Sequence, residues 1–390
     1  MQKPLNIFVH RASECLTDHE SHGDGLICFS LLNGLAERGH QVFAYTNTAL
    51  IRQCSPNLHV KTARHLVPAN SLAPWEHSWR AEQWMKELER TTTFDLVWRM
   101  HPYGGGCPYP PQTSGRPLVV GPLFYGWPEQ PGEKPASGQP RFGVGLQSLV
   151  APAAERGWQR TLQGAALVIC ATDPHAESMR GQLPGTAVMT LPVIVEPWQT
   201  MEPRPPRGDK KAVTLLFVAN LVPYKNPRVF CETVQRLRAA GIEARGIILG
   251  DGPECEALET WSAEVGMESA LCFKGKVPNS EVYRELTGAD FLVSLSQGEP
   301  YGRGIAEAMA VGTPAACHRS GGPADFIQDG QDGLLVNELT AAAYADRIEH
   351  TLAVPGAWER LSAGAARKAQ DWRSEVVLIR LEATLRRVCA

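Results

Sequence analysis

Residues 290 to 327 read ADFLVSLSQGEPYGRGIAEAMAVGTPAACHRSGGPADFI and combine a strand, a loop and a helix. Phe291 to Leu295 form an apolar run of strand length. Gln297 to Gly304 form a polar, glycine-rich loop, and Ile305 to Val311 form a short apolar helix. Open α/β sheets bind ligands where such strands end, so this segment predicts an α/β fold with a ligand site at the loop.

Two carboxylates, Glu299 and Glu307, lie within this segment. On one straight helix their spacing would leave them about 12 Å apart along the axis. Gly302 and Gly304 indicate instead that Glu299 lies on the loop and Glu307 on the helix. The two carboxylates are therefore expected to contact different parts of one extended ligand. The alternative interpretation is a surface loop with two solvated acids.

The backbone between the two carboxylates predicts a phosphate position. The amides of Tyr301, Gly302 and Arg303 open the helix, where unpaired N–H groups and the helix dipole favour an anion. A second glycine cluster, Ser320 to Pro323, repeats the arrangement of a strand followed by a glycine turn.

These features resemble the E-x7-E segment and the "GG" turn of retaining GT-B glycosyltransferases, most of all those of family 4. In that family the first glutamate contacts sugar hydroxyls of a nucleotide-sugar donor, and the second usually contacts the ribose. The resemblance implies these roles for Glu299 and Glu307. It also implies a GT-B fold, in which two Rossmann-like α/β/α domains face each other across a cleft.

Length and net charge limit the number of domains and the kinds of partner to be expected. A chain of 390 residues favours two domains, and a net charge of −3 gives no bulk attraction to nucleic acid. No apolar run approaches the ~20 residues of a membrane span, and the N-terminus resembles a strand more than a secretion signal. We therefore expect a cytoplasmic protein with at most peripheral membrane contact. The ten cysteines lack a C-x-x-C pattern and are expected to be reduced core thiols, with no metal site.

Phosphate contacts are also predicted in the second half of the chain. The segment ANLVPYKN, residues 219 to 226, resembles the family's "GRL-x-x-x-KG" at Leu221 and Lys225. Lys225 is expected to neutralise charge on the leaving diphosphate, whereas the alternative is a solvated loop lysine. Asn220 stands where the family has arginine, and Arg303 or Arg228 could supply that charge. The turn that begins at Gly250 is expected to border the donor.

The first half offers a looser match. Gly23 and Gly25 precede a predicted helix from about Leu26 to Arg38, and the family places a glycine loop here that faces the donor diphosphate. His22 beside this loop is an acceptor-side catalytic candidate, with a surface residue as the alternative. Many family members carry a histidine near the position of Leu123.

Another histidine follows a neighbouring strand. His101 could replace the family histidine that is missing near Leu123, although a structural histidine is the alternative. His40 is expected to be a turn residue that packs near the sheet.

Prolines and charges at 198–211 predict a linker between an acceptor-side domain, residues 1–197, and a donor-binding domain, residues 212–370. Residues 371–390 form a helix that could cross back onto the first domain.

Together these features predict a retaining, metal-independent glycosyltransferase of the hexosyltransferase type. It would move a sugar from a nucleotide diphosphate sugar to a hydroxyl acceptor, either a glycan, a lipid-linked acceptor or a small molecule, and would need no cofactor and no nucleic acid. One alternative is a GT-B sugar-nucleotide epimerase or hydrolase. Another is a donor-binding subunit without catalysis, motivated by Leu123 and Asn220. A dinucleotide oxidoreductase is least favoured, because no complete G-x-G-x-x-G follows a strand.

Overall fold

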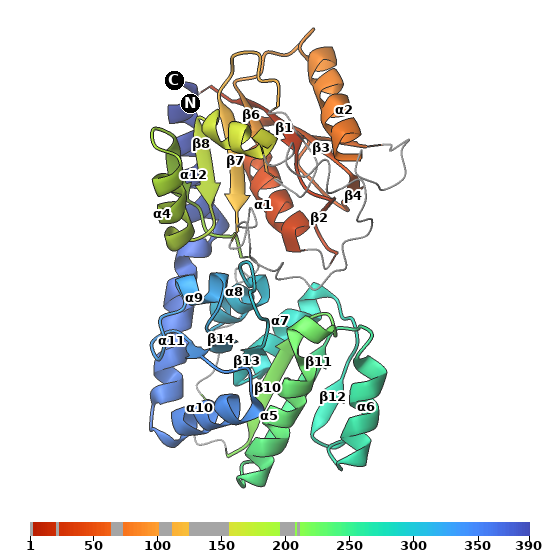
Figure 1. Ribbon diagram of the computed structural model, residues 1–390, viewed down its shortest axis with the longest axis vertical. Coiled ribbons are helices and arrows are strands. Elements are labelled where there is room, and N and C mark those ends of the chain that lie inside the picture. The colour runs from red at the N-terminus through yellow and green to blue at the C-terminus, as the bar shows by residue number, and fades with distance from the viewer. Residues whose placement is uncertain are drawn as a thin grey trace. The chain divides into compact units, whose positions relative to one another are not determined.

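The computed structural model describes residues 3–20, 23–63, 73–100, 111–124, 156–195, 207–208 and 211–390. These residues form two α/β units (Figure 1). The first unit contains the described residues up to Ile194 together with Ser374–Ala390, and the second contains those from Val195 to Arg373. Most of the expected linker, 198–211, lies outside the described residues.

The first unit is built on a seven-stranded sheet in the order β5-β3-β1-β6-β7-β8-β9, and every paired strand is parallel. The chain order runs outward in one direction from β1 and in the other from β6, so the topological switch point lies between these two strands. The strands are β1 (Asn6–Arg11), β3 (Gln41–Thr46), β5 (Leu58–Thr62), β6 (Leu96–Arg99), β7 (Leu118–Leu123), β8 (Leu167–Cys170) and β9 (Ala187–Thr190). A small second sheet pairs β2 (Cys15–Thr17) with β4 (Thr48–Leu50).

Helices pack on the sheet of the first unit. Phe8 and Val97 belong to one core cluster with Met85 of α2 (Ala73–Leu88) and Met179 of α4 (Asp173–Gln182). Residues 156–163 are also helical, and Trp158 belongs to the same cluster. Two further helices, α1 (Gly23–Glu37) and α12 (Ser374–Cys389), pack against each other.

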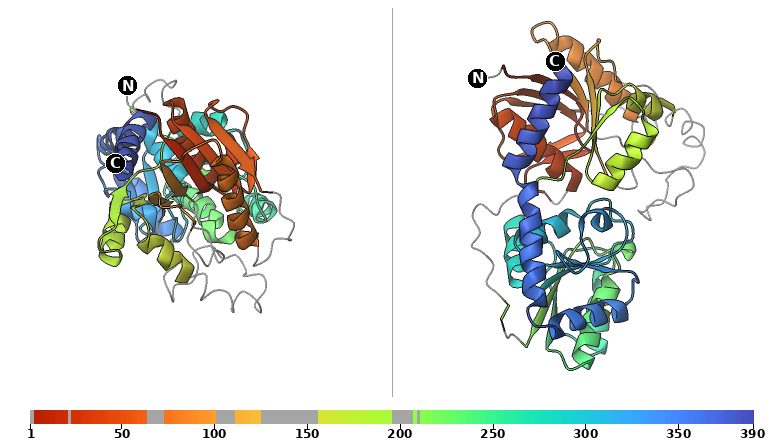
Figure 2. Two further views of the ribbon diagram at one scale, coloured as in Figure 1. Left: turned by 90° about the horizontal axis from the view of Figure 1, so that it is seen from above. Right: turned by 90° about the vertical axis from the view of Figure 1, so that its left-hand side faces the viewer.

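The C-terminal helix α12 therefore belongs to the first unit, where Figure 2 shows it beside the N-terminal strands. Arg38 Nε lies 2.7 Å from Glu382 Oε2, and Arg386 Nη2 lies 2.8 Å from Glu382 Oε1. Although burial opposes it, the hydrogen bonds from these two arginines lower the pKa of Glu382. His40 is buried and accepts a hydrogen bond from the Leu5 amide at 3.0 Å, which is the structural role expected for it.

The second unit contains a six-stranded parallel sheet in the order β12-β11-β10-β13-β14-β15. Its topological switch point lies between β10 and β13. The strands are β10 (Val213–Val218), β11 (Ala244–Leu249), β12 (Leu271–Phe273), β13 (Phe291–Ser294), β14 (Ala315–His318) and β15 (Leu334–Val336).

Helices cover both faces of this sheet. Alternate residues of β10, Leu215 and Phe217, pack with Phe230 of α5 and Tyr344 of α10 in one buried cluster. The buried side chains of α7 and α8 lie outside that cluster, and these helices contact β10 and β13. The helices are α5 (Pro227–Ala239), α6 (Cys255–Glu264), α7 (Asn279–Gly288), α8 (Arg303–Ala310), α9 (Gly322–Phe326), α10 (Ala341–Ala353) and α11 (Ala357–Ala369), with short 3₁₀ turns η2 (Pro223–Lys225) and η3 (Gln370–Trp372).

Candidate active site

A lysine and a glutamate from separate loops meet at the switch point of the second unit. The loop after β10 carries Lys225, and the loop after β13 carries Glu299. Lys225 Nζ lies 2.6 Å from Glu299 Oε2, and each side chain keeps 18% of its surface exposed. Two residues predicted separately from the sequence are thus brought together at the position where open α/β sheets bind ligands.

Local backbone geometry fixes the loop that carries Lys225. Lys225 ends the 3₁₀ turn η2, and Asn226 follows in the left-handed region at φ 51°. The Asn226 side-chain amide donates to the carbonyl of Leu295 at 2.9 Å. The two loops on either side of the switch point are therefore hydrogen-bonded to each other.

Gly250 directly follows β11, and its backbone packs closely against the start of the same loop. Its φ is +135°, and a Cβ atom built on it would lie 1.8 Å from the carbonyl oxygen of Ala219. Only glycine allows this close approach of two backbones. Asn220, next to Ala219, is exposed, and its side chain remains a prediction as a donor contact.

The second glycine cluster holds Glu299 in place. The Gly322 amide donates to the Glu299 carbonyl at 2.8 Å, and the Gly298 amide donates to Ser320 Oγ at 3.1 Å. A Cβ on Gly321 would lie 2.3 Å from the Glu299 carbonyl oxygen. The second glycine turn, Ser320–Pro323, therefore supports the backbone of Glu299.

The helix that follows begins earlier than the sequence suggested. α8 starts at Arg303, so Gly304 lies inside the helix and not in the loop. The reason is Gly302, which adopts the left-handed conformation at φ 88° as the N-cap residue and ends the loop itself. The ring of Tyr301 packs on Phe326, with centroids 5.2 Å apart, so Tyr301 would offer a ligand its backbone amide.

Glu307 is not a free carboxylate. Only 7% of the residue is exposed, and Arg303 Nε lies 2.8 Å from Glu307 Oε1. The hydroxyl of Tyr283 on α7 also hydrogen-bonds with Glu307 and Arg303, and burial followed by the charge of Glu307 raises the pKa of Tyr283. Sequence reasoning missed this cluster, although the i,i+4 spacing of Arg303 and Glu307 on a helix was a visible signal.

Both arginines that were candidates to replace the family arginine at Asn220 already have interaction partners. Arg303 is paired with Glu307. Arg228 Nε lies 2.8 Å from Glu232 Oε1, and its guanidinium lies over the Trp261 ring at 4.0 Å from the centroid. Lys225 is therefore the cation that the described residues place beside Glu299.

The site residues predicted in the first unit either lie in a different element from the one expected or fall outside the described residues. Gly23 and Gly25 form the first turn of α1, whereas the sequence suggested a loop that ends before a helix at Leu26. Gly23 has no atom within 4 Å of a built Cβ, so no close backbone approach requires glycine there. His22 and His101 lie outside the described residues.

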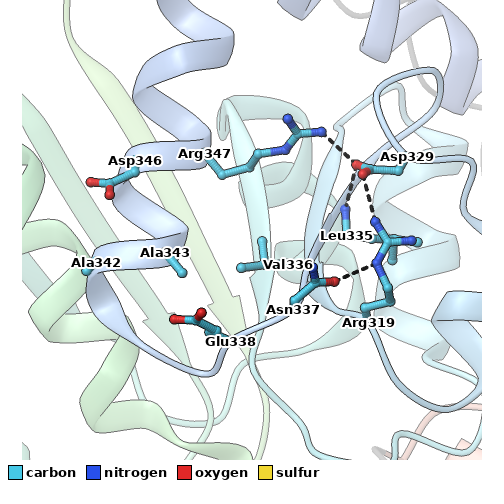
Figure 3. Close-up of a pocket in the computed structure, with 10 residues that line it drawn as sticks. All are labelled: Arg319, Asp329, Leu335, Val336, Asn337, Glu338, Ala342, Ala343, Asp346 and Arg347. Atoms are coloured by element: carbon cyan, nitrogen blue, oxygen red, sulfur yellow. Dashed lines mark hydrogen bonds and ion pairs between the residues drawn. The ribbon is translucent and has the colours of Figure 1, made fainter.

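A hollow of about 500 Å³ lies elsewhere in the second unit and is lined by β15, α10 and the loops that carry Arg319 and Asp329 (Figure 3). Arg319 and Arg347 both contact Asp329, each at 2.8 Å. Burial opposes ionisation, but the amide of Leu335 and the two arginines lower the pKa of Asp329. Each arginine thus has a carboxylate partner, and the hollow contains none of the predicted site residues.

The described residues contain neither a metal-binding cluster nor a membrane-spanning helix. No group of three or more histidine, cysteine or acidic side chains there could hold a metal ion. Not one helix in that part of the chain has the length and apolar character needed to cross a bilayer. The cysteines of the described ranges are all free thiols.

Solved structures share this fold. Sucrose-phosphate synthase from Thermosynechococcus elongatus superposes with a TM-score of 0.71 over 99% of both chains, at 16% sequence identity. HepE from Anabaena, solved in complex with UDP, gives a TM-score of 0.66 over 98% of this chain and 99% of its own, at 15% identity. These structures confirm the GT-B fold class predicted from the sequence.

Sequence comparison identifies curated relatives over part of the chain. The 2-deoxystreptamine glucosyltransferase of Streptomyces kanamyceticus is 31% identical over 139 residues, which is 36% of each chain. A D-inositol 3-phosphate glycosyltransferase of Geodermatophilus obscurus is 34% identical over 167 residues, 40% of this chain and 36% of that protein. The chain thus spans little more than a third of these relatives.

The family comparison covers the second unit. The family described as "Glycosyl transferases group 1" matches residues 200–368, which include both the Lys225–Glu299 pair and Glu307. Through residues 200–368, the chain is similar to the glycosyl transferases group 1 family.

Proposed function

We propose that the protein is a retaining glycosyltransferase of family 4 type, which transfers a sugar from a nucleotide diphosphate sugar to a hydroxyl acceptor without a metal ion. The observation that carries this proposal is the Lys225–Glu299 pair, at 2.6 Å, at the switch point of a sheet within the residues that match a glycosyltransferase family. Its action in the cytoplasm, with at most peripheral membrane contact, remains a prediction.

The pair has the chemistry that sugar transfer from a diphosphate requires. Breakage of the bond between the anomeric carbon and the diphosphate oxygen places negative charge on the leaving group. An ammonium group fixed at that point stabilises the charge as it develops. Glu299 can accept hydrogen bonds from sugar hydroxyls, and its contact with Lys225 keeps the sugar-binding and phosphate-binding groups in a fixed relation.

Retention of configuration follows from the geometry that the E-x7-E resemblance implies. The acceptor hydroxyl attacks the anomeric carbon on the face that the diphosphate leaves, and its proton passes to the departing phosphate oxygen. No covalent intermediate on the protein is needed. The roles proposed for this chain are therefore to bind, to orient and to stabilise charge.

The donor and the acceptor are supported unequally by the comparisons. HepE was solved with UDP, which makes UDP the first nucleotide to test. The names of the curated relatives refer to 2-deoxystreptamine and to D-inositol 3-phosphate, two different acceptors. We therefore propose a nucleotide-sugar donor and leave the acceptor to be found.

The first experiment is a thermal-shift screen of UDP, GDP, ADP, TDP and their sugars. A ligand that binds the folded state raises Tm, and a preference for one nucleotide would identify the donor class. The absence of a shift with every nucleotide at millimolar concentration would count against the proposal.

Two variants then test the assigned roles. Lys225→Ala should lower turnover by about 10²–10³-fold, the usual cost of losing a group that stabilises transition-state charge, with a smaller effect on donor affinity. Glu307→Gln should weaken donor binding. Lys274→Ala is the matched control, since Lys274 pairs with Glu285 at the same 2.6 Å but follows β12, away from the switch point.

A further inference from the structure

Two arginines lie side by side at the switch point of the first unit. Arg11 ends β1, Arg99 ends β6, and the two residues are register partners in the parallel pair. Arg11 is 3% exposed and Arg99 is 2% exposed. The first sheet therefore carries buried positive charge at the topological position where the second sheet carries Lys225 and Glu299.

A β-bulge sets the direction of Arg11. Val9 pairs with Trp98 and Arg11 pairs with Arg99, so His10 is one extra residue in β1. Such a bulge bends the strand and re-aims the side chain that follows it. Burial, then the charges of Arg99 and Arg11, lower the pKa of His10 to about 3. His10 is therefore neutral at pH 7, and the positive charge belongs to the arginines.

The guanidinium of Arg11 has more donors than acceptors around it. Arginine cannot lose its proton in a protein, unlike the histidine beside it. Within the described ranges, the carboxylate bonded to Arg11 is that of Glu14, 2.5 Å from Nη2, and Glu14 is shared with Asn47. The Arg11 atoms Nε and Nη1 are buried and have no hydrogen-bond partner among those residues. The guanidinium of Arg99 lies 5.8 Å from the centre of the Trp158 ring.

A buried guanidinium with two unused donors is costly, because desolvation of the charge is not offset by hydrogen bonds. An oxyanion at Arg11, beside Arg99, would supply the missing acceptors, and the planar guanidinium fork matches both phosphate and carboxylate. We propose that Arg11 and Arg99 bind an oxyanion carried by the acceptor. Its assignment to the acceptor rests on the proposed function, in which Lys225 of the second unit serves the donor diphosphate.

Inorganic phosphate is the probe for this site, titrated against chloride at constant ionic strength with Tm as the readout. The wild-type chain should gain Tm with phosphate, and Arg11→Met should lose that gain. The exposed-surface control Arg38→Gln should keep it. A phosphate shift that survives in Arg11→Met, or no shift in the wild type, would overturn the proposal.

Glu14→Gln provides a test in the opposite direction. The Glu14 side chain is 37% exposed, so its replacement leaves the core intact while it removes the carboxylate that competes for Arg11. The apparent Kd for phosphate should fall on the order of 10-fold, the scale of one hydrogen bond to a charged group. If Arg11 had only a structural role, removal of the Glu14 carboxylate would not tighten anion binding. An unchanged Kd would therefore contradict the proposal even if Arg11→Met fails to fold.

Two further arms separate the sources of the anion. UDP binding should be unaffected by Arg11→Met, and its loss together with phosphate binding would assign the site to the donor and overturn the acceptor assignment. Acetate at the same ionic strength distinguishes a carboxylate from a phosphate preference. The proposed function is tested separately, since a chain that binds phosphate through Arg11 but no nucleotide would retain the anion site and lose the glycosyltransferase assignment.

Discussion

Substitution of Gly250 by alanine should disturb the Lys225 loop from a position outside it. A Cβ on Gly250 would lie 1.8 Å from the Ala219 carbonyl oxygen and 2.8 Å from its carbon, so the two backbones must separate. The φ of +135° adds backbone strain of about 1–3 kcal/mol for any side chain. With the overlap included, we expect Gly250→Ala to destabilise the second unit by about 3–5 kcal/mol.

Gly266→Ala is the control for this prediction. Gly266 also has a positive φ, +69°, but no atom lies within 4 Å of a built Cβ, so only the left-handed strain of about 1–2 kcal/mol applies. Amide hydrogen exchange of β10 and β11 measures the opening free energy of the second unit without assuming that the whole chain unfolds in one step. UDP affinity should fall on the order of tenfold or more in Gly250→Ala alone, because the loop is misplaced. Equal losses in the two variants would refute the role of the close contact.

Three other predictions concern pH, the C-terminal helix and metal. His10 has a folded pKa of about 3, against 6.5 when unfolded, so the unfolded state binds the extra proton between these values. The free energy of unfolding, measured by urea denaturation, should therefore fall by about 2 kcal/mol between pH 6.5 and pH 5. His10→Gln should reduce this loss. Glu382→Gln should cost about 1–3 kcal/mol and speed hydrogen exchange in α12, whereas exposed Glu375→Gln should not. EDTA should leave turnover unchanged; a loss restored by Mg²⁺ would contradict metal independence.

Much of the second unit could be predicted from the sequence because its elements follow local patterns. The predicted strand Phe291–Leu295 differs from β13 (Phe291–Ser294) by one residue. The predicted start of α8 at Ile305 was wrong, since Gly304 was interpreted as loop although Gly302 alone caps the helix. Glycine content located the turn, but only the backbone conformation showed which glycine ends it.

Contacts between side chains of different elements could not be predicted, because they depend on long-range register. Tyr283 lies on α7 and reaches Glu307 only when α7 packs beside α8. The pairing of Arg11 with Arg99 requires β1 and β6 to be neighbours and a bulge at His10. No local sequence pattern encodes either contact.

Glu307 illustrates how neighbouring side chains affect the role that a motif suggests for a residue. By resemblance this carboxylate contacts the donor ribose, but here Arg303 already forms an ion pair with it and Tyr283 hydrogen-bonds with it. A ribose hydroxyl donates a hydrogen bond, and a carboxylate has acceptor sites for several donors, so these partners need not leave when the donor binds. Arg303 instead compensates the burial of Glu307, at 7% exposure, and fixes the orientation of its oxygens. We therefore interpret Arg303 as a positioning residue for Glu307, which leaves Lys225 as the cation for the donor diphosphate.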